Sequence, residues 1–423
     1  MKKINIGIIG FGVVGSGVYS LLEKNSAIIT ERTGIQIQIA AICDLNTDMV
    51  KKTTNHPGVT SKWEEIIDNP DIEIVVELIG GINPAKDIIL AAFSKGKSVV
   101  TANKKLLAEE GEEIFNTANS SNVQLGYEAS VAGGIPCIQA LKHGLVGNKV
   151  KSVIGILNGT TNYILTKMTE TSANFDDVLK DAQAKGFAEA DPTFDIEGFD
   201  AGHKITLLSM LSYNKKVSYK DIQIDGITKL RTLDFEFAEE MGYTIKLLGI
   251  CNEVNGKLDI RVHPAMLPNR HPLSSVNDEF NAVMFDCDMT DPILLYGKGA
   301  GSDPTASAVV GDIVQIGRLK EIPEPALIIN GDATLLTSEE RISHYYIRIY
   351  TEDQPGLLAK IAGVFGNNNI SIASVLQKEM AESVIPLIIV THDVKESDMK
   401  KAIHEINEFD FIKNEIVVIK IEK

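Results

Sequence analysis

The stretch GFGVVG, at residues 10–15, constrains the fold more than any other part of this chain. It directly follows a β-branched run at residues 4–9 and precedes a helical pattern at residues 18–30. In the pattern G-x-G-x-x-G, Gly10 permits a tight turn, Gly12 lets the backbone approach a pyrophosphate, and Gly15 lets the helix pack close to the strand. We therefore predict a dinucleotide site here, in preference to a plain tight turn.

Runs typical of strands alternate with helical patterns in the first part of the chain, and the strand-like runs lie at residues 4–9, 35–43, 74–78, 98–101 and 123–127. Strand and helix in series predict an α/β fold with a parallel, doubly wound sheet. Asp44 follows the second run, where a carboxylate accepts from a ribose 2′-OH and repels a 2′-phosphate. Asp44 therefore favours NAD, but Lys51 and Lys52 lie near enough in the sequence to leave NADP open.

The later part of the chain does not continue the regular alternation of strand and helix patterns. Longer mixed segments from about residue 132 predict an inserted α+β unit. A glycine loop then leads into a helix for which Ser302 or Asp303 is the expected N-cap. The last segment reads β-α-β-β-α-β from residue 345, which is typical of a split βαβ unit of ferredoxin-like type.

Composition narrows the class of partner. The formal net charge of −16 leaves no basic excess to neutralise phosphates, which argues against nucleic acid and anionic membranes and favours a small-molecule ligand. The four cysteines lack metal-ligand spacing, so we expect reduced thiols in a cytoplasmic protein. No segment reaches about 18 uninterrupted apolar residues, so we predict no membrane span.

Lys204 lies in the stretch EGFDAGHKITLLSML, where helical spacing places it on the apolar face with Asp200 one turn before it. A buried ammonium is costly unless it is paired or has a chemical role. Three interpretations remain open: Lys204 extends to solvent, it pairs with Asp200, or it takes part in chemistry.

The stretch VVTANKKLLA ends a predicted strand and opens a helix, at the sheet edge where ligands of such folds bind. The simpler interpretation is an N-cap, Thr101 or Asn103, followed by two solvated lysines. Lys104, however, falls in the first helical turn, where a cation opposes the helix dipole. That unfavourable position suggests that a ligand needs the charge.

Two further stretches are rich in backbone polar groups. GYEASVAGGIP, with Glu128, is either a hinge between domains or a loop that binds a monovalent cation through a carboxylate and carbonyls. GILNGTTNYIL runs from a strand into a polar turn, which suits hydrogen bonding to a substrate or a nicotinamide amide, or simply caps a helix.

Seven ordered motifs together resemble the homoserine dehydrogenase family, in its monofunctional form with a C-terminal ACT domain. They are GFGVVG, TANKKLLA, YEASVAGGIP, NGTTNYI, GFAEADPTFDIEGFDAGHK, GAGSDPTASAVVGDI and YTEDQPGLLAKIAGVFGNNNISI. The family interconverts L-homoserine and L-aspartate 4-semialdehyde with NAD(P), in threonine, methionine and isoleucine biosynthesis. The resemblance covers nearly the whole chain.

The resemblance implies a role for each matching residue. Lys204 matches the proton donor, and Lys104 matches a second active-site lysine. The implied substrate-binding residues are Glu189, Asp200, Asn158 and Thr160. The implied cofactor-binding residues are Gly10, Phe11, Gly12, Val13, Val14, Gly15, Asp44, Thr101, Lys104, Gly186 and Gly301. A sodium-type site is implied at Glu128 with the carbonyls of Val131, Gly133 and Ile135.

The resemblance also implies a domain plan. We predict a Rossmann-type domain at residues 1–131, completed by 302–330, a catalytic and dimerisation domain at 132–301, a linker at 331–344 and an ACT regulatory domain at 345–423. Threonine is the expected effector, bound near residues 353–356 and 367–370 at an interface between ACT domains, in a homodimer or homotetramer.

Two rival functions are less favoured. The first is another NAD(P)-dependent dehydrogenase of amino acids or semialdehydes, against which NGTTNYI and GFDAGHK argue. The second is a non-catalytic sensor with a nucleotide fold and an ACT domain, which has no need of lysines at both catalytic positions.

Overall fold

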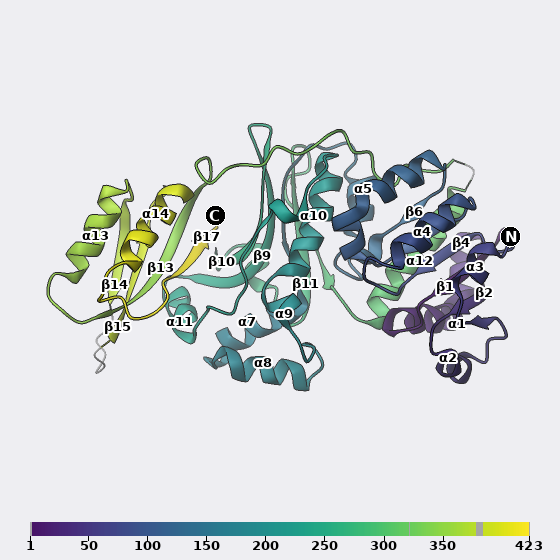
Figure 1. The fold of residues 1–423 in the computed structure, drawn as a ribbon, viewed down its shortest axis with the longest axis horizontal. Coiled ribbons are helices and arrows are strands. Elements are labelled where there is room, and N and C mark those ends of the chain that lie inside the picture. The colour runs from purple at the N-terminus through teal and green to yellow at the C-terminus, as the bar shows by residue number, and fades with distance from the viewer. Residues whose placement is uncertain (1, 321, 378–383, 423) are drawn as a thin grey trace. The chain divides into compact units, whose positions relative to one another are not determined.

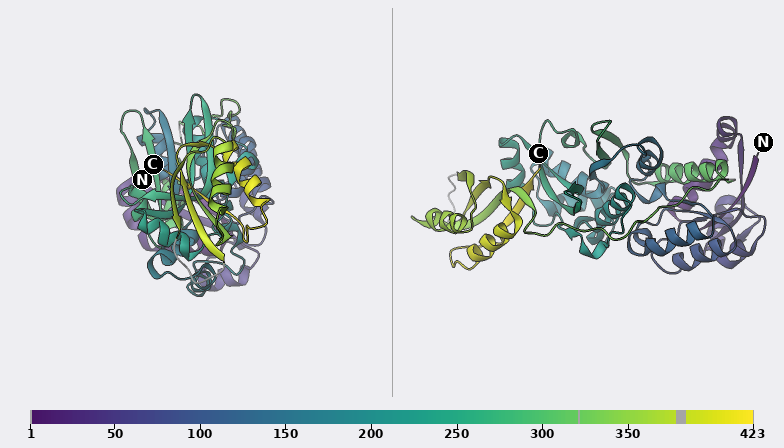
Figure 2. Two further views of the ribbon diagram at one scale, coloured as in Figure 1. Left: turned by 90° about the vertical axis from the view of Figure 1, so that its left-hand side faces the viewer. Right: turned by 90° about the horizontal axis from the view of Figure 1, so that it is seen from above.

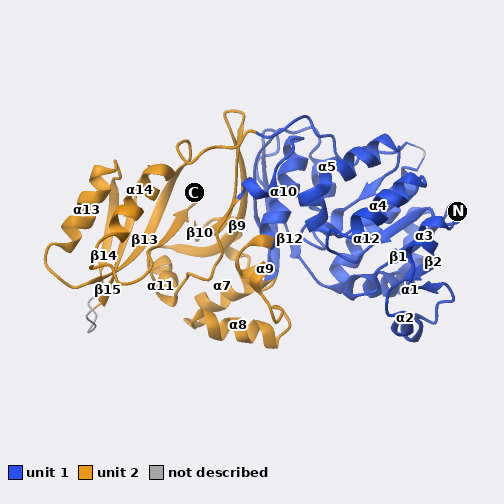
Figure 3. Cartoon of the chain, viewed as in Figure 1, with its two compact units in different colours: residues 1–159, 200–222, 280–333 blue, residues 160–199, 223–279, 334–423 orange. Residues whose placement is uncertain are grey.

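The computed structural model describes residues 2–320, 322–377 and 384–422 (Figure 1). The chain divides into two compact units, each built from three segments of sequence (Figure 3). Unit 1 comprises residues 1–159, 200–222 and 280–333, and unit 2 comprises residues 160–199, 223–279 and 334–423. The domain boundaries expected from the sequence stay a prediction, because compactness groups the chain in a different way.

A six-stranded parallel sheet with the order β3-β2-β1-β4-β5-β6 forms the centre of unit 1. Its strands are β1 (Lys2–Ile9), β2 (Ile35–Cys43), β3 (Val59–Thr60), β4 (Ile74–Glu77), β5 (Ser98–Thr101) and β6 (Leu125–Gly126). The order reverses direction at β1, so the switch point of the sheet lies beside the glycine turn. The predicted parallel, doubly wound sheet is confirmed.

Helices cover this sheet, and one of them comes from a distant part of the sequence. They are α1 (Val13–Thr33), α2 (Thr47–Thr54), α3 (Trp63–Asp68), α4 (Ala85–Ser94), α5 (Lys104–Ser120) and α12 (Ser302–Arg318). Figure 2 shows α12, in green, lying with the purple and blue elements of the first part of the chain. The buried side chains of Val18, Val309 and Ile313 share one core cluster with the sheet residues Ile6 and Ile8.

The start of α12 differs from the prediction. Its N-cap is Gly301, with a φ of 117°, and Ser302 and Asp303 are already helical. Ser302 is therefore inside the helix and not at its cap position, and its hydroxyl donates to the carbonyl of Val13 at 2.9 Å. The glycine is needed because a side chain rarely adopts that backbone conformation.

Unit 1 also holds a three-stranded antiparallel segment and the helix that carries Lys204. The strands are β7 (Val150–Ile156), β11 (Phe280–Cys287) and β12 (Ile293–Lys298). The helical elements are η1 (Glu128–Ser130), α6 (Cys137–Gln139), η2 (Ala140–Gly144), α10 (Phe199–Tyr213) and η3 (Tyr219–Asp221). α6 is a short α-helical turn, and η2 continues it as a π-helical turn.

Unit 2 contains the ferredoxin-like segment. Strands with the order β9-β10-β17-β13-β15-β14 run through it, and β17 lies parallel to β10 and antiparallel to β13. The strands are β8 (Gln223–Ile224), β9 (Tyr243–Val254), β10 (Lys257–Pro268), β13 (Ile342–Glu352), β14 (Ile372–Gln377), β15 (Val384–Thr391), β16 (Val394–Lys395) and β17 (Val417–Ile421). The predicted β-α-β-β-α-β order is confirmed.

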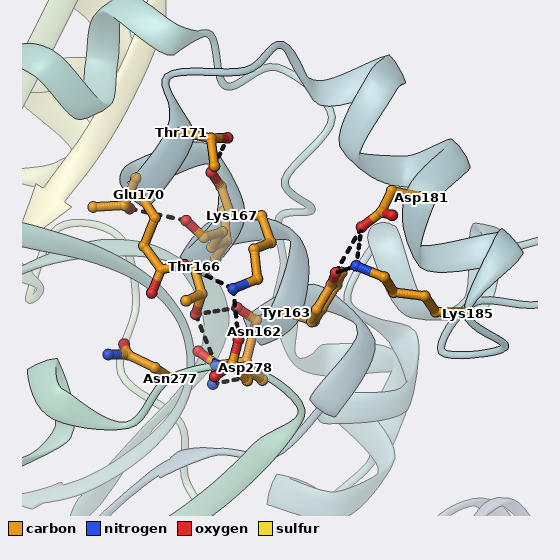
Figure 4. A network of polar contacts seen from close by, with 12 residues as sticks. Asn162, Tyr163, Thr166, Lys167, Glu170, Thr171, Asp181, Lys185, Asn277 and Asp278 are labelled. Atoms are coloured by element: carbon orange, nitrogen blue, oxygen red, sulfur yellow. Dashed lines mark hydrogen bonds and ion pairs between the residues drawn. The ribbon is translucent and has the colours of Figure 1, made fainter.

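The helices of unit 2 are held by polar contacts as well as by apolar packing. They are α7 (Gly159–Thr171), α8 (Phe175–Ala184), α9 (Thr193–Ile196), α11 (Thr232–Glu240), η4 (Pro272–Ser275), α13 (Leu357–Asn367) and α14 (Glu396–Asn407). Figure 4 shows the Tyr163 hydroxyl of α7 beside Asp181 of α8 and Lys185, the C-cap of α8. Lys167 contacts Asp278 at 3.0 Å, which ties α7 to the loop between η4 and β11. Across the described helices, none is long and apolar enough to cross a membrane.

A buried ion pair joins α11 to the ferredoxin-like segment. Arg348 Nε lies 2.7 Å from Asp234 Oδ1, and the Tyr346 hydroxyl donates to the same carboxylate at 2.9 Å. Asp234 is fully buried.

We expect Asp234→Ala to lower the free energy of unfolding by about 3–5 kcal/mol, because it leaves the Arg348 guanidinium buried without its partner. Urea unfolding followed by circular dichroism measures the change. Glu352→Ala is the matched control: its pair with Lys413 is partly exposed, so we expect a loss of about 1 kcal/mol or less. Equal effects of the two substitutions would contradict the assignment.

Candidate active site

Two helices of unit 1 bring the candidate catalytic lysines together. The Asn103 side chain accepts a hydrogen bond from the backbone N–H of Leu106 at 3.1 Å, so Asn103 is the N-cap of α5 and Lys104 is its first residue. Asp200 and Lys204 lie one turn apart on α10. The capping interpretation of this motif and the functional interpretation of Lys104 are therefore compatible.

Asp200 bridges the two lysines. Its Oδ1 lies 2.8 Å from Lys104 Nζ, and its Oδ2 lies 2.6 Å from Lys204 Nζ. Asn158, directly after β7, donates to Oδ2 at 2.9 Å. Lys204 also donates to the carbonyl of Leu157 at 2.6 Å. Four residues that the sequence singled out separately thus form one hydrogen-bonded group.

The structure excludes one of the three interpretations of Lys204. Its side chain is 8% exposed, so it does not extend to solvent, and it is paired with Asp200 as expected from the spacing. Burial opposes the charge of Asp200, but Lys204 and then Lys104 hold the pKa of its carboxyl well below the ordinary value. The lysines differ in access: the Lys104 side chain is 36% exposed. A buried, charge-balanced ammonium beside a more accessible one can donate a proton in a site that excludes most water.

Sequence reasoning missed a contact that holds α5 against α10. His203 Nε2 lies 3.0 Å from Glu109 Oε1, and the His203 ring stacks on Tyr219 with centroids 4.0 Å apart. Burial lowers the pKa of His203, an effect that Glu109 opposes. Glu109 follows Lys104 on α5, and His203 precedes Lys204 on α10, so this pair fixes the spacing of the two lysine-bearing helices. In the sequence, the feature that could have indicated this contact is that His203 directly precedes Lys204.

The glycine turn has the geometry that a dinucleotide needs. Gly10 has a φ of 98°, and a Cβ on Gly15 would lie 2.1 Å from the Gly10 carbonyl oxygen. No atom lies within 4 Å of a Cβ placed on Gly12, so the backbone there is open to a ligand. Asp44 accepts hydrogen bonds from the backbone N–H groups of Phe11 at 2.7 Å and Asn46 at 2.8 Å. Asp44, which directly follows β2, therefore stabilises the glycine turn through its contact with Phe11. Val13 is exposed at the start of α1.

Thr101 is buried at the end of β5 and donates to Glu77 Oε2 at 2.6 Å. Burial raises the pKa of Glu77, although the Thr101 hydroxyl and the N–H groups of Ile79 and Gly80 oppose the shift. Asn103 donates to the carbonyl of Gly81 at 2.6 Å. The Thr101 hydroxyl is thus engaged within the protein, where it supports the loop after β4.

Glu128 is buried against the first turn of α6. Its carboxylate accepts from the backbone N–H groups of Ile138 at 2.9 Å and Gln139 at 2.7 Å. Asp312 of α12 accepts from the Glu128 N–H at 2.8 Å. Burial, and next the charge of Asp312, raises the pKa of Glu128 to about 8.

The other predicted cation ligands lie in the same loop. Val131, Gly133 and Ile135 are all buried, and Gly133 has a φ of 51°. Within the described ranges, no group of three or more His, Cys, Asp or Glu side chains is arranged to hold a metal ion. Any cation at this loop would therefore depend mainly on carbonyl oxygens, as the sequence suggested.

The remaining predicted residues are divided between the two units. Gly301 is the N-cap of α12 in unit 1. Thr160, Gly186 and Glu189 belong to unit 2, where the Thr160 hydroxyl donates to the carbonyl of Phe187 at 2.6 Å. Gly186 has a φ of 76°, and Glu189 is exposed.

Comparisons with known families match three consecutive parts of the chain. Residues 10–128 match the family model described as homoserine dehydrogenase, NAD binding domain, and residues 136–314 match homoserine dehydrogenase. Residues 345–410 match the ACT domain. Together these models cover most of the chain.

Individual relatives agree with the family models. The homoserine dehydrogenase of Neisseria gonorrhoeae is 43% identical, over 100% of this chain and 99% of its own length. A crystal structure of a homoserine dehydrogenase from Thiobacillus denitrificans has a TM-score of 0.95 at 40% identity and covers 100% of this chain and 99% of that one. A hyperthermophilic archaeal homoserine dehydrogenase in complex with NADPH has a TM-score of 0.64 at 27% identity, covering 76% of this chain and 99% of that one.

We expect Gly12→Ala to leave the melting temperature unchanged but to weaken NAD(P) binding about tenfold or more, because the added methyl meets no protein atom yet occupies the path of the pyrophosphate. Fluorescence titration measures the dissociation constant. Gly15→Ala should instead lower the melting temperature, because its methyl clashes with Gly10. Gly311→Ala, in open space on α12, is the control and should change neither binding nor the fold. Unchanged binding by Gly12→Ala would contradict the assignment.

Proposed function

The chain belongs to the homoserine dehydrogenase family, and from that premise we propose how its residues divide the reaction. The enzyme is an NAD(P)-dependent oxidoreductase that interconverts L-homoserine and L-aspartate 4-semialdehyde, a step of threonine, methionine and isoleucine biosynthesis. Its C-terminal part is an ACT domain, a type of domain associated with regulation by amino acids. One observation supports the proposed roles most strongly: a buried carboxylate pairs with both candidate lysines.

Lys204 is the proposed proton donor. Bound NAD(P)H supplies the hydride for reduction of the aldehyde. Negative charge then builds on the carbonyl oxygen, and the Lys204 ammonium stabilises that charge and donates its Nζ proton to the oxygen. In the oxidative direction the same nitrogen takes the proton of the substrate hydroxyl. Burial of the Lys204 side chain and its pairing with Asp200 support this role.

Asp200 and Lys104 are proposed to orient the substrate. Asp200 can accept from the substrate ammonium while it keeps Lys204 directed inward, and Asn158 fixes the carboxylate through the bond to Oδ2. Lys104 is more exposed and sits where a cation opposes the helix dipole, so an anionic group of the substrate or cofactor offsets that cost. Glu189 and Thr160 remain proposed substrate residues from the family pattern alone.

The proposed cofactor site comprises the glycine turn, its edge and the loops beside it. Gly12 offers open backbone to the pyrophosphate, and Asp44 can accept from a ribose 2′-OH. The roles of Thr101, Gly186 and Gly301 follow the family pattern. The match to an NAD binding domain and the relative in complex with NADPH together support NAD(P) as the cofactor.

The loop around Glu128 is the proposed site of a monovalent cation such as sodium. Glu128 and Asp312 are both buried carboxylates, and burial also raises the pKa of Asp312, to about 6. A cation beside Glu128 would offset the cost of its buried charge, so the residues present fit such a group. The carbonyls of Val131, Gly133 and Ile135 would complete its ligands.

Regulation, assembly and location are proposed from the same premise. We infer that threonine binds near residues 353–356 and 367–370 where two ACT domains meet, and that the enzyme is a homodimer or homotetramer. The proposed domains are those predicted from the sequence, with the ACT domain at residues 345–423. Four free cysteines in the described structure are compatible with the reducing cytoplasm that the sequence predicts.

We expect Lys204→Ala to lower kcat by about 10²–10⁴ while the dissociation constant for NAD(P)H stays within a factor of two or so, because the residue acts on the reacting oxygen. Steady-state kinetics with L-homoserine, together with a cofactor titration, measure both quantities. The exposed neighbour of Lys104 gives the control, since Lys105→Ala should keep full activity. If Lys104→Ala loses kcat by that factor and Lys204→Ala does not, the donor is Lys104 and the assignment is wrong.

The Glu128 site predicts a pH-dependent effect of sodium. The folded protein holds the Glu128 proton up to about pH 8, whereas the unfolded chain loses it near the ordinary value of 4.5, so stability without a cation falls as pH rises between those values. Sodium must displace this proton, so its affinity should rise about tenfold per pH unit below pH 8 and then level off.

Melting temperatures in sodium chloride and in choline chloride of equal ionic strength, at about pH 6 and about pH 9, measure this effect. We expect stabilisation by sodium at the higher pH and little at the lower one. Glu128→Gln should remove the difference between the salts. An equal effect of sodium at both pH values would contradict the site.

A further inference from the structure

A cavity of about 590 Å³ lies within unit 2 and involves none of the residues assigned above. Strands β8, β10, β13 and β17 contribute to its lining. Helix α14 contributes Glu396, Lys400 and His404. Figure 1 labels β10, β13, β17 and α14, and all these elements belong to unit 2, drawn in orange in Figure 3. The cavity is separate from the effector position proposed for the ACT domain and does not depend on that proposal.

Three polar side chains of the cavity lie on one face of the sheet. Tyr345 of β13 and Lys420 of β17 are direct cross-strand partners, so their side chains lie side by side. Lys420 also pairs with Ala265 of β10 in parallel register. His263 precedes Ala265 by two residues and therefore shares its face. The three side chains form a row across β13, β17 and β10.

Each member of this row is buried and has hydrogen-bonding capacity that the described protein does not use. Tyr345 is 2% exposed, His263 3% and Lys420 7%. Among described residues, neither the Tyr345 hydroxyl nor His263 Nε2 has a partner at full hydrogen-bond geometry. A weak contact with Ser343 only partly opposes the burial that raises the pKa of Tyr345. Lys420 Nζ donates to Glu396 Oε2 across a long 3.5 Å. Buried polar groups are normally satisfied, so three neighbours of this kind around one cavity indicate a ligand.

The protonation state of His263 defines what such a ligand must offer. His263 Nδ1 lies 2.9 Å from the carbonyl of Pro264, which can only accept, so Nδ1 carries the proton. Burial, and next the charges of Lys420 and Arg261, lowers the pKa of His263 well below its ordinary value, so the ring is neutral. Nε2 is therefore an acceptor that requires a donor, and Glu422, 3.6 Å away, cannot supply one when ionised.

The charges around the cavity favour a dipolar ligand over a simple anion. Its lining includes the lysines 229, 400 and 420 and the carboxylates of Glu197, Asp225 and Glu396, so the formal charges of these groups cancel. Lys420 and Tyr345 both donate, whereas His263 Nε2 accepts. A molecule with a carboxylate at one end and an ammonium at the other satisfies all three.

We propose that this cavity binds a small zwitterionic amino acid, whose carboxylate accepts from Lys420 Nζ and the Tyr345 hydroxyl and whose ammonium donates to His263 Nε2. The ligand joins β10 to β13 and β17, the strands at which the ferredoxin-like segment meets the rest of unit 2. Binding there stiffens that junction.

The test uses the full-length protein and a panel of common L-amino acids, screened by thermal shift and then measured by isothermal titration calorimetry. Propionate and propylamine are probes that carry one of the two charged groups each. We expect at least one amino acid to bind, and both single-charge probes to bind about tenfold or more weakly.

Variants locate the binding. Tyr345→Phe removes a hydroxyl that makes no well-formed hydrogen bond within the protein, so the variant should keep its fold and its catalytic activity. We expect its dissociation constant for the amino acid to rise about tenfold. Lys420→Met should abolish binding. Tyr350→Phe, on the opposite face of the same strand, is the matched control and should bind as the unmodified protein does.

The proposal is overturned if no amino acid binds, if propionate binds as tightly as the amino acid, or if Tyr345→Phe leaves the affinity unchanged. The last result would place the bound amino acid elsewhere, such as at the ACT loops. Because Tyr345→Phe does not disturb a satisfied group, it remains decisive even if Lys420→Met fails to fold.

Discussion

The candidate active site in unit 1 depends on one buried carboxylate. Asp200 lies between the ammonium groups of Lys104 and Lys204, and each of its oxygens contacts one of them. Without Asp200, the two ammonium groups would lack their shared counter-charge, and Lys204 would be a buried cation without its ion-pair partner. The turn after β7 adds Asn158 and the Leu157 carbonyl, so three separate elements converge on this single group.

Other buried carboxylates in the chain also need a group that offsets the cost of burying their charge. At Glu128, burial and then the charge of Asp312 raise the pKa of the carboxyl to about 8, against the opposing effect of its two backbone N–H donors. At Asp234, by contrast, the Arg348 guanidinium balances the charge within the protein. Glu128 lacks a full counter-charge within the protein, and there we propose a bound cation, whereas the balanced Asp234 stabilises the fold.

The sequence predicted features that local chemistry determines. The glycines of GFGVVG indicated the turn, strand and helix alternation indicated the parallel sheet, and spacing paired Asp200 with Lys204. Features that depend on distant residues were not predictable in this way. The contact between Glu109 and His203 joins positions on separate helices, and no periodicity reveals it. The parallel pairing of β10 with β17 joins strands far apart in the chain, so the cavity beside them was invisible from the sequence. The prediction placed the cap of α12 at Ser302 or Asp303, but the helix begins at Ser302 and its N-cap is Gly301. The Ser302 hydroxyl donates to the carbonyl of Val13 in α1, a contact between residues far apart in the sequence.

The central claim is that Asp200 couples Lys104 to Lys204, and a double-mutant cycle on the free energy of unfolding tests it most directly. Lys104→Met and Lys204→Met are compared singly and together, first with Asp200 present and then with Asn at that position. The loss of both lysines should cost about 1–3 kcal/mol more than the sum of the single losses, because it leaves a buried carboxylate without any counter-charge. With Asp200→Asn the effects should become additive. Additive effects with Asp200 in place would contradict the account.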